Sequence, residues 1–147
     1  MKKYSIKTKK LNTNAIIPTQ GSSQAAGYDL YACINNQIYI PAHQTRVIPT
    51  GIAVELPEGT FGGIYARSGL ATKEGLRPAN CVGVIDSDYR GEVMVAIHND
   101  TDTMKIVDPN SRIAQLIVIP YVSVGFDVVD QLDETDRGDG GFGSTGR

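Results

Sequence analysis

The sequence predicts an all-β protein, either a sandwich or a barrel of short strands. Apolar and polar residues alternate with a period of two in several segments, and turn residues separate these segments. The segments recur at roughly the spacing of 8 to 12 residues that is typical of such folds. Gly 16 and Pro 7 in 147 residues supply many turns, and the length corresponds to one domain.

The expected strands follow one another with turns between them. Residues 37–40 alternate and stop at Pro41, and residues 51–56 alternate up to the turn at residues 57–59. Residues 61–65 are expected to return from that turn as a hairpin. Further strands are expected at residues 92–97, 104–107, 113–119 and 121–129.

Two segments depart from the strand pattern. Residues 68–75 predict a short helical turn, because their glycines disfavour a longer helix. Residues 133–147 are rich in Gly and Asp, so they cannot bury enough apolar area to order themselves. We therefore expect a β-domain over residues 1–132 and a flexible arm over 133–147. The arm is either a frayed terminus or a segment that orders over a ligand.

Composition disfavours several classes of protein. The net charge of −2 and a pI near 5.6 argue against a nucleic-acid or membrane-surface partner, which would call for a basic face. The basic start has no apolar stretch behind it, so we expect no signal peptide and a cytoplasmic protein. Neither the two cysteines nor the two histidines show a metal or redox spacing.

Three internal segments carry polar residues that a plain β-domain does not need. Residues 26–31 place one carboxylate among apolar and aromatic neighbours. Residues 66–71 place a guanidinium and a hydroxyl beside a glycine, which suits a phosphate. Residues 83–91 form a hairpin connection crowded with acids. Together they offer an arginine for phosphate, an aspartate for water activation and an aromatic ring for a base or sugar.

Five segments of the chain resemble, in order and spacing, the motifs of the dUTPase family, the homotrimeric deoxyuridine triphosphate nucleotidohydrolases. They are AGYDLYA (26–32), ARSGLA (66–71), GVIDSDYRGEV (83–93), RIAQLI (112–117) and RGDGGFGSTG (137–146). The resemblance implies an antiparallel β-barrel of jelly-roll type, a homotrimer whose active sites draw on three subunits, and hydrolysis of dUTP to dUMP and pyrophosphate. That activity would limit uracil incorporation into DNA and supply dUMP for thymidylate synthesis.

The resemblance also implies the chemistry of two residues. Asp86 would hold and deprotonate the water that attacks the α-phosphorus, a role for which a carboxylate ionised at neutral pH needs only placement. Tyr89 would pack against the deoxyribose and exclude a 2′-hydroxyl. On the residues alone, Asp86 could equally cap a turn, and Tyr89 could be an ordinary strand aromatic.

Binding residues follow from the same resemblance. The uracil pocket would be formed by Asn80, Val84, Ile85, Asp86 and Met94. The phosphates would be bound by Arg67, Ser68, Gly69 and Gln115. From the arm, Arg137 would pair with the γ-phosphate, Phe142 would stack on uracil, and Gly143 and Ser144 would donate hydrogen bonds.

The resemblance implies Mg²⁺ as cofactor, held mainly by the substrate phosphates and water. Asp29 would orient Arg67 and touch the water shell of the metal, although a purely structural ion pair between the two is the alternative. Two positions depart from the family pattern. Ala66 replaces a proline, and Ser111 replaces the aspartate that precedes Arg112. The other functions considered are a dCTP deaminase, a bifunctional deaminase–dUTPase, and a regulatory binding protein that keeps the fold without catalysis.

Overall fold

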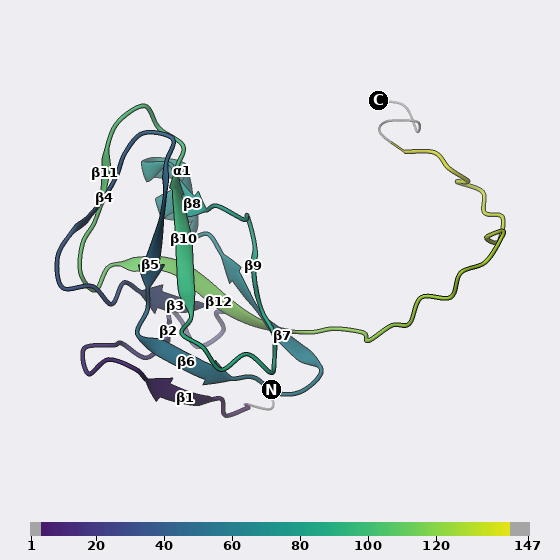
Figure 1. Cartoon of the computed structure of the whole chain (residues 1–147), viewed down its shortest axis with the longest axis horizontal. Helices are drawn as coiled ribbons and strands as arrows, with labels where there is room; N and C mark the ends of the chain where they lie inside the picture. The colour runs from purple at the N-terminus through teal and green to yellow at the C-terminus, as the bar shows by residue number, and fades with distance from the viewer. Residues whose placement is uncertain (1–3, 142–147) are drawn as a thin grey trace.

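Strands dominate the chain, as the alternation predicted. The computed structural model describes residues 4–141, and within them twelve strands accompany one short helix (Figure 1). All strand pairs there are antiparallel. The all-β prediction is therefore confirmed, and the arrangement fits a jelly-roll barrel.

The largest sheet has five strands in the order β2-β3-β12-β7-β9. Its strands are β2 (Thr19–Gln20), β3 (Tyr28–Tyr31), β12 (Arg112–Pro120), β7 (Thr60–Tyr65) and β9 (Gly83–Ile85). The long central strand β12 pairs with β3 on one side and β7 on the other. Segments from both ends of the chain therefore meet on β12.

The other strands form three smaller sheets. A three-stranded sheet has the order β5-β10-β8, and two pairs are β1-β6 and β11-β4. Their bounds are β5 (Thr45–Pro49), β10 (Met94–Asn99), β8 (Leu76–Pro78), β1 (Lys7–Lys10), β6 (Ile52–Glu55), β11 (Lys105–Val107) and β4 (Ile38–Ile40). The helix α1 (Ser68–Glu74) ends at Gly75, whose φ of 66° suits a glycine cap.

One apolar core joins the sheets. On β10 the buried side chains Val95 and Ile97 alternate with Met94, Ala96 and His98, which are exposed or half-buried, as expected for a strand with one face inward. Fully burying a valine or isoleucine stabilises the fold by about 1.5–3 kcal/mol. The core also includes Leu30, Ile48, Ile64 and Ile113, which lie on β3, β5, β7 and β12 respectively.

The expected hairpin between residues 51–56 and 61–65 is wrong, although both strands exist. β6 pairs with β1, whereas β7 pairs with β12 and β9. The turn before β7 is closed by a hydrogen bond from the Thr60 N–H to the Pro57 carbonyl, and it carries the chain from one sheet into another. The connection at residues 83–91 is likewise no hairpin, because β9 and β10 belong to different sheets.

The expected strand at residues 121–129 is also wrong. β12 ends at Pro120, and every residue from 121 to 129 is exposed and outside any strand. Val122, Val124 and Phe126 are 84%, 64% and 93% exposed. The alternation is genuine, but no strand in residues 4–141 pairs with it, and the segment leaves the barrel as an extended chain (Figure 1). The predicted domain boundary after residue 132 remains a prediction.

The described residues hold no helix that is long and apolar enough to span a membrane.

Candidate functional site

The phosphate-binding residues predicted from the sequence gather where β7 meets α1. Arg67 directly precedes α1 in extended conformation, and Ser68 and Gly69, which open the helix, are exposed. A Cβ added to Gly69 would meet no atom within 4 Å, so the space beside this backbone is open. An arginine and a hydroxyl beside open backbone can accommodate a phosphate.

Asp29 fixes the Arg67 side chain. The Nε of Arg67 donates to Asp29 Oδ1 at 2.8 Å, and both side chains are largely buried, at 28% and 14% exposed. The predicted orientation of Arg67 by Asp29 therefore has a direct geometric basis, and the contact is equally a structural ion pair. Arg112 adds a second guanidinium, since its Nη1 lies 3.3 Å from Asp29 Oδ2. The sequence offered no signal for that second contact.

Gln115 supports the same turn through the backbone. It lies on β12 between Asp29 of β3 and Tyr65 of β7, and its Nε2 donates to the Ala66 carbonyl at 2.8 Å. A Cβ on Gly27 would lie 2.2 Å from the Gln115 Oε1, so only glycine leaves room for this side chain. A direct contact between Gln115 and a phosphate remains a prediction.

Most of the residues predicted to bind the base and the sugar and to activate the water line a second site, a cavity beside β9. A cavity of about 180 Å³ is lined by Val84, Ile85, Asp86, Tyr89, Glu92 and Met94. Five of these six were candidates from the sequence, and Glu92 was not. The exposed Asp86 also borders a neighbouring hollow of about 700 Å³, which Tyr121 and Arg90 line as well. Asp86 therefore borders two neighbouring hollows.

Asn80 approaches this second site from the segment that precedes β9. It is exposed, and its Nδ2 would lie 3.4 Å from a Cβ placed on Gly83, the first residue of β9. Asn80 thus lies beside the strand whose last two residues, Val84 and Ile85, line the cavity.

Contacts within residues 86–92 hold the Asp86 loop in shape. The Arg90 Nη1 donates to the carbonyls of Ser87 and Tyr89 at 2.7 and 3.1 Å. The Tyr89 hydroxyl donates to the Glu92 carbonyl at 3.1 Å, and its ring lies against Gly91. Arg90 and Gly91 belong to the quoted motif, but their supporting roles depend on the folded loop and were missed.

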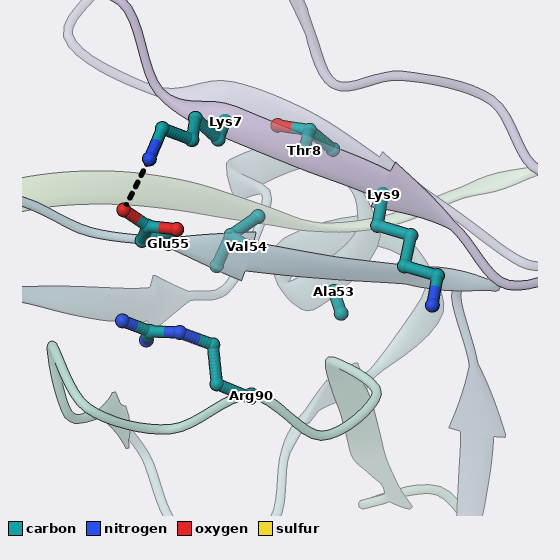
Figure 2. A pocket seen from close by; sticks show the side chains of 7 residues that line it. All are labelled: Lys7, Thr8, Lys9, Ala53, Val54, Glu55 and Arg90. Carbon is teal, nitrogen blue, oxygen red and sulfur yellow. Dashed lines mark hydrogen bonds and ion pairs between the residues drawn. The ribbon is translucent and has the colours of Figure 1, made fainter.

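A third hollow of about 340 Å³ lies between the paired strands β1 and β6 and the loop that carries Arg90, and it involves none of the predicted residues (Figure 2). Lys7 and Glu55, which oppose each other on the two strands, form an ion pair of 2.8 Å at its edge. The hydrogen bond and charge of Lys7 lower the pKa of Glu55 below its ordinary value, and Arg90 acts in the same direction. Lys9 and Arg90 complete a mainly cationic rim.

Several predicted residues are not brought together. Within residues 4–141, no hydrogen bond or ion pair links the Arg67 group to the Asp86 cavity. Arg137 is exposed in a turn at residues 136–139, and its Nε donates to the Gly140 carbonyl at 2.9 Å. Phe142, Gly143 and Ser144 lie outside the described residues.

The described residues hold no cluster of three or more His, Cys, Asp or Glu placed for a metal ion. Asp29 already has an arginine on each carboxylate oxygen. Each oxygen can still accept another hydrogen bond, for example from a metal-bound water. This donor set fits an ion carried mainly by the phosphates of a ligand rather than one caged by the protein.

Comparisons with known proteins point to one family. A model of the dUTPase family matches residues 13–146. The deoxyuridine 5'-triphosphate nucleotidohydrolase of Syntrophotalea carbinolica is 44% identical over 146 residues, which cover 99% of both chains. A dUTPase of Staphylococcus bacteriophage 80alpha, solved with dUpNHpp, superposes with a TM-score of 0.89 at 26% identity and covers 99% of this chain and 100% of its own.

A dUTPase variant of phage phi11 of S. aureus, reported with a coordinated structural Mg(II) ion, shares the fold. Its TM-score is 0.80 at 22% identity, with 89% of this chain and 100% of that chain covered. The family match extends over nearly the whole chain and includes every motif quoted from the sequence. The chain belongs to the dUTPase family.

Proposed function

We propose that the protein is a dUTP diphosphatase, which hydrolyses dUTP to dUMP and pyrophosphate. The observation that carries this proposal is the cavity in which Asp86, Tyr89 and Met94 meet the backbone of β9. It combines a carboxylate, an aromatic ring and a strand edge in one small space. The names of the relatives and the dUTP analogue bound by the phage enzyme support the same substrate.

The chemistry requires one base and one attacking water. Asp86 accepts a proton from the water as its oxygen bonds to the α-phosphorus, and the bond from that phosphorus to the pyrophosphate oxygen breaks. Tyr89 packs against the deoxyribose, where a 2′-hydroxyl would clash. Asn80 and the main chain of residues 84–86, with Met94, bind uracil. Buried polar groups reject a base with the wrong hydrogen-bond pattern, because those groups would be left unpaired.

The phosphate end is bound by Arg67, Ser68 and Gly69, with Gln115 beside them. Mg²⁺, bound mainly to the phosphates and touching Asp29 through water, would neutralise charge on the triphosphate. Arg67 then pairs with phosphate oxygens while Asp29 holds its Nε. From the arm, Arg137 reaches the γ-phosphate, Phe142 stacks on uracil, and Gly143 and Ser144 donate hydrogen bonds. Closure of the arm would exclude water and strengthen each of these interactions.

We further propose a homotrimer with active sites between subunits. Its support in the chain is the segment after β12, where Val122, Val124, Phe126 and Val128 alternate with the residues between them and are all exposed. A row of exposed apolar side chains of this kind is typical of an interaction site. A further copy of the chain can cover it. The mass of the active species by light scattering tests this, and an active monomer would contradict it.

Pyrophosphate release from dUTP, dCTP, dTTP and UTP, each with Mg²⁺, tests the function. We expect release from dUTP alone, and its loss in Asp86→Asn. Asp88→Asn is the matched control, since Asp88 is an exposed aspartate of the same loop that does not line the cavity of Tyr89. Ammonia release from dCTP would favour a deaminase instead. A wild-type protein inactive on dUTP would favour a binding protein. The cytoplasmic location remains a prediction.

A further inference from the structure

A bulge in β12 brings Arg112 to the face of the sheet that carries Asp29. The pairing of β12 with β3 is regular at Gln115 and Ala114, which oppose Asp29 and Leu30, but shifts before Arg112, which opposes Tyr31. Without the shift, Arg112 would oppose residue 32 and point to the other face, because strand side chains alternate. Ile113 is the residue left without a partner on β3, and both it and Ala114 are buried, so the side chains of Arg112 and Gln115 on either side of them lie outside the core.

Asp29 is consequently shared by two guanidinium groups. Its Oδ1 accepts from the Arg67 Nε at 2.8 Å, and its Oδ2 lies 3.3 Å from the Arg112 Nη1. One carboxylate between two arginines leaves one net positive charge at this place. Both terminal nitrogens of Arg67 have no partner in residues 4–141, so their donors are available to a ligand.

Position 111 leaves Arg112 free for this contact. The residue at this position, beside the arginine, is a serine and carries no charge. The Ser111 hydroxyl donates to the Asp108 carbonyl at 2.7 Å. No carboxylate next to Arg112 in the sequence therefore competes with Asp29.

We propose that Arg112 is a positioning residue for the phosphate end of the site and acts through Asp29. By occupying Oδ2, it restricts Asp29 to a single contact with the Nε of Arg67. An arginine facing a carboxylate with both oxygens free commonly pairs through two parallel N–H groups. Loss of Arg112 would therefore draw a terminal nitrogen of Arg67 onto Asp29 and away from the phosphates. This inference rests on the proposed function, in which Arg67 binds the triphosphate.

A comparison of two ligands distinguishes this positioning role from a general effect of Arg112 on the structure. The dissociation constants of dUpNHpp, which carries the phosphates, and of deoxyuridine, which has none, are measured by calorimetry with Mg²⁺. We expect Arg112→Ala to weaken dUpNHpp binding about five- to tenfold, in the range of coupled ion pairs, and to leave deoxyuridine binding unchanged. Arg112→Lys should restore part of the affinity. Arg46→Ala is the control, because the one hydrogen bond of the Arg46 guanidinium within residues 4–141 goes to the neighbouring Thr45 carbonyl.

The double variant tests the route through Asp29. If Arg112 acts only through that carboxylate, Arg112→Ala should have no further effect on dUpNHpp affinity in an Asp29→Asn background. An undiminished effect in that background would mean that Arg112 contacts the phosphates itself and would overturn the proposal. Unchanged dUpNHpp affinity in Arg112→Ala, or equal weakening of both ligands, would overturn it as well. Wild-type protein that fails to bind dUpNHpp would overturn the proposed function, and this inference with it.

Discussion

Gly91 sets the position of the Tyr89 ring, and its replacement by alanine is the sharpest test of the sugar-binding proposal. A Cβ on Gly91 would lie 2.3 Å from the Tyr89 hydroxyl oxygen and 2.5 Å from Cζ. Gly91 is not among the residues with positive φ, so its backbone accepts alanine without strain. Gly91→Ala therefore acts on the ring rather than on the main chain.

The size of the displacement follows from the contact distances. Ordinary contacts of a Cβ begin at 3.4 Å, so the hydroxyl end of the ring must move by 3.4 − 2.3 = 1.1 Å at least. That shift would break the bond to the Glu92 carbonyl, for a net loss of about 1 kcal/mol in the free energy of unfolding. A misplacement of about 1 Å near the reacting groups can cost up to about a hundredfold in rate.

Steady-state pyrophosphate release from dUTP and UTP measures the consequence. In Gly91→Ala we expect kcat/KM for dUTP to fall about tenfold and kcat/KM for UTP to fall less. The ratio of the two values, which measures selection of deoxyribose over ribose, should therefore decrease. Tyr89→Phe is the first control, since it removes the hydroxyl bond but keeps the ring. Gly21→Ala is the second, because a Cβ there meets nothing within 4 Å. A folded Gly91→Ala enzyme with the wild-type ratio of dUTP to UTP would refute the reasoning.

Three further changes have defined outcomes. The Cβ added by Gly27→Ala would displace the Gln115 side chain from the Ala66 carbonyl. We therefore expect KM for dUTP to rise about fivefold with little change in Tm, and an unchanged KM would contradict this. Asn99 is fully buried, and its Nδ2 lies within hydrogen-bond distance of the carbonyls of Ile40, Pro41 and Thr103. Asn99→Ala should therefore lower the free energy of unfolding, measured in urea, by about 3 kcal/mol, and a decrease of less than about 1 kcal/mol would contradict this. The hydrogen bond from Arg77 lowers the pKa of Asp100 from 3.8, so this pair stabilises the fold fully above that pH and loses its effect as the pH falls through the lowered pKa. Tm should accordingly fall more steeply below pH 4 in the wild type than in Asp100→Asn, and parallel Tm curves would disprove it.

Strands with clear alternation could be predicted from the sequence, and strands whose pairing depends on distant partners could not. The pattern found β6, β10 and β12, and the glycines around residues 68–75 correctly limited α1 to a short helix. β1 was missed because Lys7–Lys10 has little strand propensity of its own and is held by its pairing with β6. β8 was missed because it is three residues long and ends in proline.

The wrong hairpin and the wrong last strand share one cause. Turn residues show that the chain changes direction, but not which strand it meets next. At residues 57–59 the chain passes to another sheet, and after Pro120 the alternation continues without a partner in residues 4–141. Pairing is decided by contacts far apart in the sequence, which a local pattern does not contain.

The reactive residue types were accessible from the sequence, while their supports were not. Asp29, Arg67 and Asp86 stand in recognisable segments. The contact of Arg112 with Asp29 depends on a one-residue bulge, and the role of Gly91 depends on the distance to one ring. Both are consequences of register and packing, so they appear only in three dimensions.

Arg67 and Asp86 lie in separate groups of residues, and this separation predicts that each active site takes the two residues from different subunits. One dUTP must reach both Arg67 and Asp86, yet no hydrogen bond or ion pair connects their groups in residues 4–141. If the two residues of a site come from different copies, two inactive variants should complement each other. Arg67→Ala and Asp86→Asn, denatured and refolded together in equal amounts, should regain about a quarter of the wild-type sites, since random assembly of a cyclic oligomer places both intact residues at one site in four. Each variant refolded alone should stay inactive. If the mixture also stays inactive although mixed oligomers form, both residues of each site belong to one chain.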